Sequence, residues 1–254
     1  MRRQRGFTLT ELIMVIVILS IVATISVQFI RFSTQGAIDV SSRQQVAVAG
    51  MNILEPMVRD LRGALPESIR MTGDCIEFLP IAAAGRYQAL PKDTNDPGAL
   101  QTLSGPPEDL TEESYLVINP FADPGNRPQE SETVRTADPI VSWSGTEIEI
   151  GDEAPFTQDS PARRFFLVTE PEAYCFNENE GLLRRVENYG FGTPSANDGQ
   201  VAGAGVTEFE VSIDEPSLNR NALVILELTL ESLRSGAREE DHKLAREVQI
   251  RNVP

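Results

Sequence analysis

The chain has 254 residues, a net charge of −16 at neutral pH, one histidine and two cysteines. This length favours one or two domains, and the part beyond the first 30 residues is long enough to bury one sizeable core. Residues 63–254 carry 34 acidic against 15 basic side chains. A net charge of −19 there repels phosphate backbones, which argues against nucleic-acid binding as the main role.

The N-terminus is a basic cluster followed by a long apolar run. Three arginines precede Gly6, and the 24 residues at 7–30 are mostly apolar but include one acid, Glu11. As a helix this run spans about 36 Å, enough to cross a bilayer. An ordinary secretory signal peptide has a shorter apolar core, and a plain single-pass anchor explains the length and the arginines. Neither explains Glu11, because an acid at the centre of such a helix costs about 2.5–3.5 kcal/mol.

The Gly-Phe-Thr-Leu-x-Glu lead-in of residues 6–11 resembles the class III signal peptide of type IV prepilins and pseudopilins. The resemblance implies that a prepilin peptidase cuts between Gly6 and Phe7 and methylates Phe7. It also implies that Glu11 is the subunit-assembly residue. The expected protein is a single-pass protein of the bacterial inner membrane with a periplasmic C-terminal domain. Its expected partners are the peptidase, other major and minor pilins and the pilus assembly platform.

The chain departs from this family pattern at three positions. Position 10 is Thr, where the family usually carries an aliphatic residue, and Ser20 and Gln28 stand where major pilins commonly carry helix-loosening Gly or Pro. The last two departures fit a minor subunit better than a major one.

Helical spacing continues beyond the apolar run. Apolar residues recur in steps of three and four from Ala47 to Leu65, which predicts one face of an amphipathic helix. Pro56 lies inside this pattern and lacks the N–H that would bond residue 52, so we expect a kink or an interruption there. Gly63 and Pro66 are stop signals. After a leader at 1–6, the sequence therefore predicts a transmembrane and assembly helix over 7–30 and its amphipathic continuation over 31–65.

The remaining residues, 66–254, predict a periplasmic β-rich globular domain. Alternation of apolar and polar side chains is clearest at 207–213 and 222–231, which is typical of antiparallel strands with one face in water. The polar segment 233–242 predicts a hairpin turn before the last strand. Residues 91–139 are rich in Pro, Gly and Asp, and there we expect loops with one short strand. The expected strands are 75–79, 115–118, 146–150, 165–169, 174–177, 182–186, 207–213, 222–231 and 244–250.

The two cysteines, Cys75 and Cys175, both lie in the part expected to be exported, where disulfides persist. With no third cysteine to compete, we expect them to be bonded to each other. The alternative is two separately buried thiols.

No motif indicates an enzyme, and we expect no cofactor or metal. The one histidine, His242, falls in the polar turn, and Gly203-Ala-Gly205 has no following helix and indicates a turn. The acidic loops at 93–96 and 177–180 could ligate calcium, but neither has the spacing of an EF-hand.

Three further stretches resemble the MshO-like minor pilins of mannose-sensitive haemagglutinin (MSHA) pili. They are residues 57–70, residues 75–80 with Gly85-Arg86-Tyr87, and residues 182–186 with Tyr189-Gly190-Phe191. PilW-type minor pilins and the J-type pseudopilin of type II secretion share this layout. The resemblance implies an α+β pilin fold, a long N-terminal helix packed on an antiparallel sheet. It also implies a role in starting or capping a fibre, near its tip. The alternatives are a minor pseudopilin of type II secretion, a membrane-anchored periplasmic enzyme or binding protein, and a tip adhesin with a surface ligand.

Overall fold

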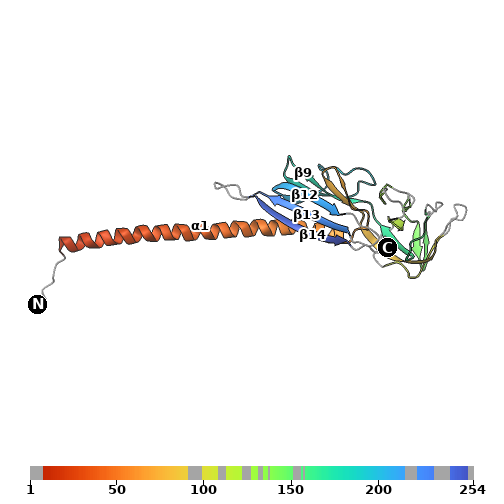
Figure 1. The fold of residues 1–254 in the computed structure, drawn as a ribbon, viewed down its shortest axis with the longest axis horizontal. Coiled ribbons are helices and arrows are strands. Elements are labelled where there is room, and N and C mark those ends of the chain that lie inside the picture. The colour runs from red at the N-terminus through yellow and green to blue at the C-terminus, as the bar shows by residue number, and fades with distance from the viewer. Residues whose placement is uncertain are drawn as a thin grey trace.

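The computed structural model describes residues 8–90, 99–107, 113–121, 127–130, 134–136, 138–150, 156, 158–214, 222–231 and 241–250. One helix, α1 (Leu9–Arg62), runs for 54 residues and projects far beyond the rest of the molecule (Figure 1). Thr8 caps its start, and Gly63 caps its end by donating its N–H to the carbonyl of Arg59. The stop signals are therefore confirmed, and the helix ends one residue before Gly63.

The expected interruption at Pro56 is wrong. Pro56 lies inside a helix that continues to Arg62. Proline removes one backbone hydrogen bond, but buried side chains flank it on both sides, namely Ile53, Leu54, Met57 and Val58. Packing on the sheets therefore holds the helix through the proline.

Two antiparallel sheets enclose the second half of α1. The five-stranded sheet has the order β1-β2-β9-β10-β11, and the three-stranded sheet has the order β12-β13-β14. Gly205, with φ +73°, lies between β11 and β12, where the chain passes from one sheet to the other. The strands are β1 (Arg70–Thr72), β2 (Cys75–Phe78), β9 (Glu172–Asn177), β10 (Leu182–Val186), β11 (Gln200–Ala204), β12 (Val206–Asp214), β13 (Ala222–Leu230) and β14 (His242–Ile250).

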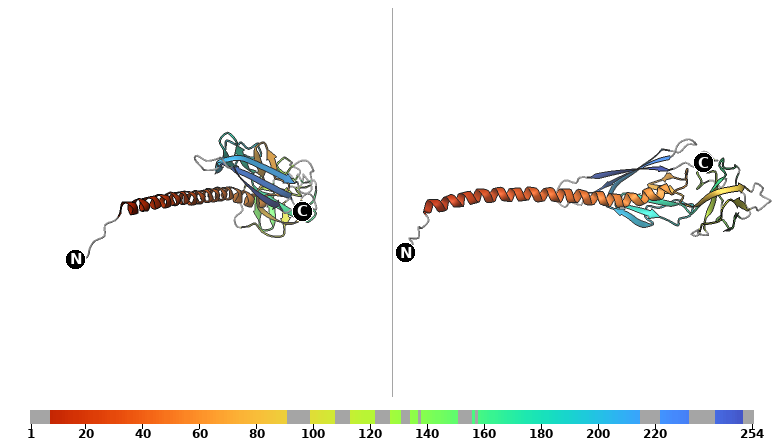
Figure 2. Two further views of the ribbon diagram at one scale, coloured as in Figure 1. Left: turned by 60° about the vertical axis from the view of Figure 1, so that its left-hand side comes forward. Right: turned by 90° about the horizontal axis from the view of Figure 1, so that it is seen from below.

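The helix lies between these sheets, as Figure 2 shows. Its buried face, from Val46 to Leu61, shares one core with Tyr174 of the five-stranded sheet and Leu226 of the three-stranded sheet. Two glycines allow this close approach. A Cβ on Gly50 would lie 2.7 Å from Leu244 Cδ1, and one on Gly203 would lie 2.5 Å from Ile53 Cδ1. We call the helix half and its two sheets the body.

A third sheet, with the order β5-β8-β3-β4-β7-β6, forms a separate lobe with its own hydrophobic core. Its strands are β3 (Ile81–Ala89), β4 (Leu100–Thr102), β5 (Tyr115–Ile118), β6 (Ser142–Ser144), β7 (Glu147–Glu149) and β8 (Arg164–Val168). All six come between β2 and β9, which are themselves paired neighbours in the body. This distal lobe is therefore one insertion between two adjacent strands. It lies beyond the C-terminal end of α1, roughly in line with the helix (Figure 1).

The α+β pilin-like fold is confirmed, and every expected strand is present within one or two residues of its expected ends. The expectation of one short strand within 91–139 is wrong, because β4 joins β5 there. His242 begins β14 and is not part of a turn. β13 and β14 pair from Leu230↔His242 onward, as a hairpin requires. Most of the turn segment lies outside the described residues.

Candidate assembly site

The first turn of α1 fixes the position of Glu11. The Thr8 hydroxyl oxygen accepts the backbone N–H of Glu11 at 3.4 Å, and that hydroxyl donates to the Glu11 carboxylate at 3.5 Å. Thr8 and Glu11 have the Thr-x-x-Glu spacing of a capping box, and an acid in a first turn is favoured by the positive end of the helix dipole. Gly6 and Phe7, the expected cleavage residues, lie outside the described residues.

The first half of α1 has no packing partner among the residues that the structure describes. Every residue from Thr8 to Ile38 is exposed, and this apolar segment is long enough to cross a membrane. Two of its hydroxyls bond within the helix, because Ser20 donates to the carbonyl of Ile16 at 2.7 Å and Thr24 to that of Ser20 at 2.8 Å. The surface of this half therefore suits hydrocarbon or the apolar faces of other helices.

A polar joint ties the second half of α1 to the body. Tyr174 donates its hydroxyl to Asp60 at 2.7 Å, and Arg185 lies 3.6 Å from the same carboxylate and 2.5 Å from Glu172. Burial, together with the Asp60 carboxylate, raises the pKa of Tyr174 above its usual range. Burial also raises the pKa of Glu172, against the opposing effect of Arg185. Local sequence patterns carry no signal for this joint, because Asp60 lies more than 100 residues before its three partners in the chain.

The end of α1 is also bonded to the base of the distal lobe. The N–H of Leu65 donates to the carbonyl of Leu79 at 2.8 Å, and the N–H of Ile81 donates to the carbonyl of Gly63 at 3.1 Å. The chain enters the lobe at Ile81, so the helix end and the lobe entry are held together.

The Cys75–Cys175 disulfide is confirmed. The two cysteines are direct partners on β2 and β9, and the N–H of Phe176 donates to the carbonyl of Asp74 beside them. They therefore form a non-hydrogen-bonded pair, the register in which facing side chains come closest. Because β2 and β9 flank the insertion, this bond closes the base of the distal lobe.

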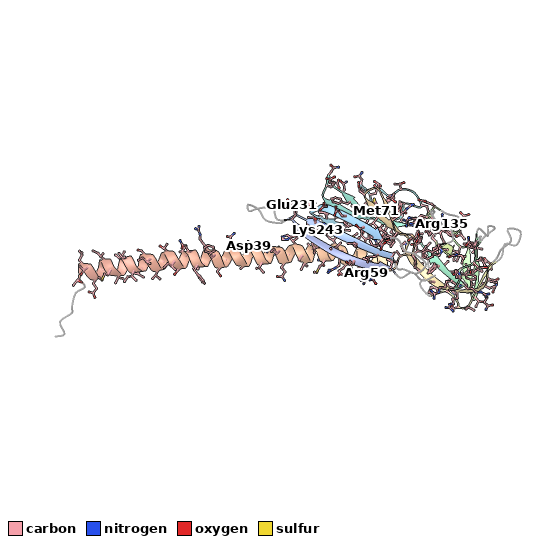
Figure 3. All side chains as sticks on the ribbon, viewed as in Figure 1. Asp39, Arg59, Met71, Arg135, Glu231 and Lys243 are labelled. Atoms are coloured by element: carbon pink, nitrogen blue, oxygen red, sulfur yellow. A yellow bond between two sulfur atoms is a disulfide. The ribbon has the colours of Figure 1, made fainter. Side chains whose placement is uncertain are left out.

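A strap of residues 127–130 ties the lobe back to the body. Arg127 and Gln129 donate to backbone carbonyls within 67–69, and Arg70 pairs with Glu130. Nearby, the guanidinium of Arg135, labelled in Figure 3, lies 3.8 Å from the centre of the Phe191 ring. The lobe is thus held at its base and along one side.

The acidic loops do not form a cation site in the part of the chain that the structure describes. No described group of three or more His, Cys, Asp or Glu side chains is placed to hold a metal. The side chain of Asn177 accepts the N–H groups of Asn179 and Glu180, so it closes a turn. Residues 93–96 lie outside the described residues. Gly203 lies within β11, and Gly205 makes the bend that was expected near it.

An exposed apolar helix with a capped acid in its first turn, packed at its other end on antiparallel sheets, defines an α+β pilin-like protein. Residues 1–27 match the family model described as the prokaryotic N-terminal methylation motif. No curated protein and no solved structure matches the chain. The chain is therefore a type IV prepilin-like protein with a structural rather than an enzymatic role. The motif implies processing by prepilin peptidase, residence in the inner membrane and then assembly with other pilins.

Proposed function

We propose that the chain is a minor pilin that starts or caps a type IV pilus of the MSHA type. The peptidase cuts between Gly6 and Phe7 and methylates Phe7, so the mature N-terminus remains a cation. The match of the first 27 residues to the methylation motif supports this processing. The stretches at 57–70, 75–80 and 182–186 support the MSHA type by resemblance alone.

Glu11 directs assembly by pairing with the N-terminal ammonium of an adjacent subunit. Among the described residues no basic group pairs with Glu11, whose side-chain contact is the capping Thr8. A charge left unpaired in hydrocarbon is costly, and breaking a buried ion pair costs about 3–5 kcal/mol. The pairing therefore selects one axial offset between subunits, while the apolar helix faces supply the remaining packing.

The position of the distal lobe is the observation that supports a place near the end of a fibre. It extends beyond the end of α1 and roughly in line with it (Figure 1). In a fibre whose helices run parallel, the space beyond each head is needed by the subunits further along. A lobe in that space leaves room for few subunits further along, which suits a place among the first subunits of a fibre and not its repeating wall.

The test is to delete the gene and to restore it with an epitope-tagged full-length chain. The proposal predicts fewer fibres per cell after deletion and label at fibre ends after restoration. Label along the whole fibre would contradict the terminal position. Unchanged fibre number with lost protein secretion would identify a type II secretion pseudopilin. Unchanged fibre number with lost surface attachment would identify a tip adhesin.

A further inference from the structure

Two opposite charges bracket the unpartnered part of α1. Glu11 lies in its first turn, Arg31 lies 20 residues later, and the 19 residues between them carry no charge. Both side chains are exposed. Arg31 has no acid at the neighbouring helix positions, which are Val27, Gln28, Thr34 and Gln35, and no described acid forms an ion pair with it. The described part of the chain therefore supplies a cation at this level of the helix without supplying its partner.

The spacing of the two charges matches a membrane. Twenty residues of α-helix rise about 30 Å, which is the thickness of a bilayer's hydrocarbon core. With the anchor inserted, Glu11 lies near the cytoplasmic edge and Arg31 near the periplasmic edge. At 100° per residue the two side chains are about 200° apart around the helix axis, on nearly opposite faces.

An open fibre requires two different contact faces on each subunit, and faces about 200° apart meet that requirement. Subunits that join head to tail present a different face on each side, so one face of each subunit meets the other face of a neighbour. A neighbour already drawn outward by about 30 Å brings its first-turn carboxylate level with Arg31 of a subunit still in the membrane.

We propose that Arg31 is the docking residue for the first-turn carboxylate of a neighbouring pilin-type helix that has already left the membrane. This rests on the proposed function, because it needs neighbours with a methylation-motif glutamate. The contact sets a second axial offset of about 30 Å, distinct from the short offset set by the N-terminal ammonium. It also gives the departing carboxylate a cationic partner at the periplasmic edge.

The first experiment changes the charge at position 31 in full-length protein in cells. Arg31→Glu places two acids together, and Arg31→Lys keeps the cation. Arg59→Glu is the control, because it makes the same charge change at an exposed site on the half of α1 that belongs to the body (Figure 3). Recovery in sheared fibres is measured per membrane-inserted protein. We expect Arg31→Glu to fall about tenfold, since like charges are forced together in a partly desolvated site. Arg31→Lys and Arg59→Glu should stay within about twofold of wild type, because a Lys keeps the charge and exposed pairs contribute little.

The second experiment maps the contact with a photo-crosslinking amino acid at Gln35, about 40° from Arg31 around the helix. A crosslinker at Ser33, about 200° from Arg31, is the matched control. Crosslinks from position 35 should fall in the first two helical turns of a neighbour, should be absent from position 33, and should vanish with Arg31→Glu.

Three outcomes overturn the inference. Normal recovery of Arg31→Glu in fibres removes the docking role, and crosslinks to the middle of a neighbour's helix place the offset elsewhere. If Arg31→Glu lowers only membrane retention, with fibre recovery per inserted protein unchanged, the partner of Arg31 is a lipid phosphate. If wild-type protein is absent from fibres, the proposed function itself fails, and the inference fails with it.

Discussion

Removal of the Cys75–Cys175 disulfide should strongly destabilise the distal lobe. The bond joins residues 100 positions apart. In the chain-entropy model, a loop of this length corresponds to about 4.7 kcal/mol at 25 °C. Since whole domains are stable by about 5–15 kcal/mol, this is a large fraction of the total.

The folded state should survive the change. Beside the disulfide, β2 and β9 remain paired through Ile76↔Tyr174, Glu77↔Ala173 and Phe78↔Glu172. The double variant Cys75→Ala/Cys175→Ala therefore keeps the strand register but loses the covalent closure of the lobe. We expect the free energy of unfolding to fall by about 3–5 kcal/mol, with the loss concentrated at β3–β8.

The assay uses the only tryptophan of the chain, Trp143 in β6 of the distal lobe. Its ring packs edge-on against Phe165, with centroids 5.6 Å apart, so its fluorescence reports on the lobe. Urea unfolding of the full chain in detergent would compare wild type, reduced wild type and the double variant. Reduction keeps both sulfur atoms, so it separates loss of the bond from loss of side-chain volume.

Equal losses in the reduced protein and the double variant would support the entropic argument. A loss below about 1 kcal/mol in both would refute it and would mean that the strap at 127–130 and the hydrogen bonds at the base of the lobe hold it without the disulfide.

Three further predictions concern the helix and its packing. Glu11→Ala should leave membrane insertion intact, because the anchor becomes more apolar. It should lower recovery of the protein in sheared fibres, because a neighbour's N-terminal ammonium loses its partner. Equal recovery of mutant and wild type would contradict the pairing. Gly203→Ala should lower the free energy of unfolding by about 1–3 kcal/mol, because its Cβ meets Ile53 at 2.5 Å, whereas Gly36→Ala, with nothing within 4 Å, should not destabilise. Tyr174→Phe should cost about 1.5–3 kcal/mol at pH 7 by removing the hydrogen bond to Asp60. The raised pKa keeps Tyr174 protonated in the folded protein, whereas the tyrosine of the unfolded chain ionises near pH 10. Wild type should therefore lose stability above about pH 10. Urea unfolding at a series of pH values should show a smaller loss of stability in Tyr174→Phe.

Local sequence patterns predicted the helix and those strands whose apolar residues recur with a clear period. The apolar run and the stripe from Ala47 to Leu65 predicted α1, and alternation predicted β12 and β13. Strand β3 was missed because its sequence, IAAAGRYQA, has little β-branched character, and it owes its form to pairing with β8 and β4. Strands β1, β4 and β6 were missed because three residues carry little local signal, whereas the equally short β7 was found from the alternation of polar and apolar residues at 146–150. Strand β11 was missed because Gly203 within it indicated a turn.

The insertion of the distal lobe could not be predicted from local sequence patterns for a different reason. Nothing local to Cys75 or Cys175 shows that their strands are neighbours, and strand order depends on contacts far apart in the chain. The cysteine count alone indicated the bond. The joint of Tyr174, Asp60 and Arg185 could not be predicted for the same reason, because no local sequence pattern distinguishes any of the three residues. Glu11, in contrast, was found from its local setting, since an acid in an apolar run needs a reason.

The mass of the mature N-terminus decides whether this chain is a processed and assembled pilin subunit. The full-length gene would be expressed in cells that contain the prepilin peptidase, and the protein would be isolated from both membranes and sheared fibres. Mass spectrometry should then find a chain that begins at N-methylated Phe7 in both fractions. An intact Met1 terminus, or cleavage after the apolar segment, would contradict the account.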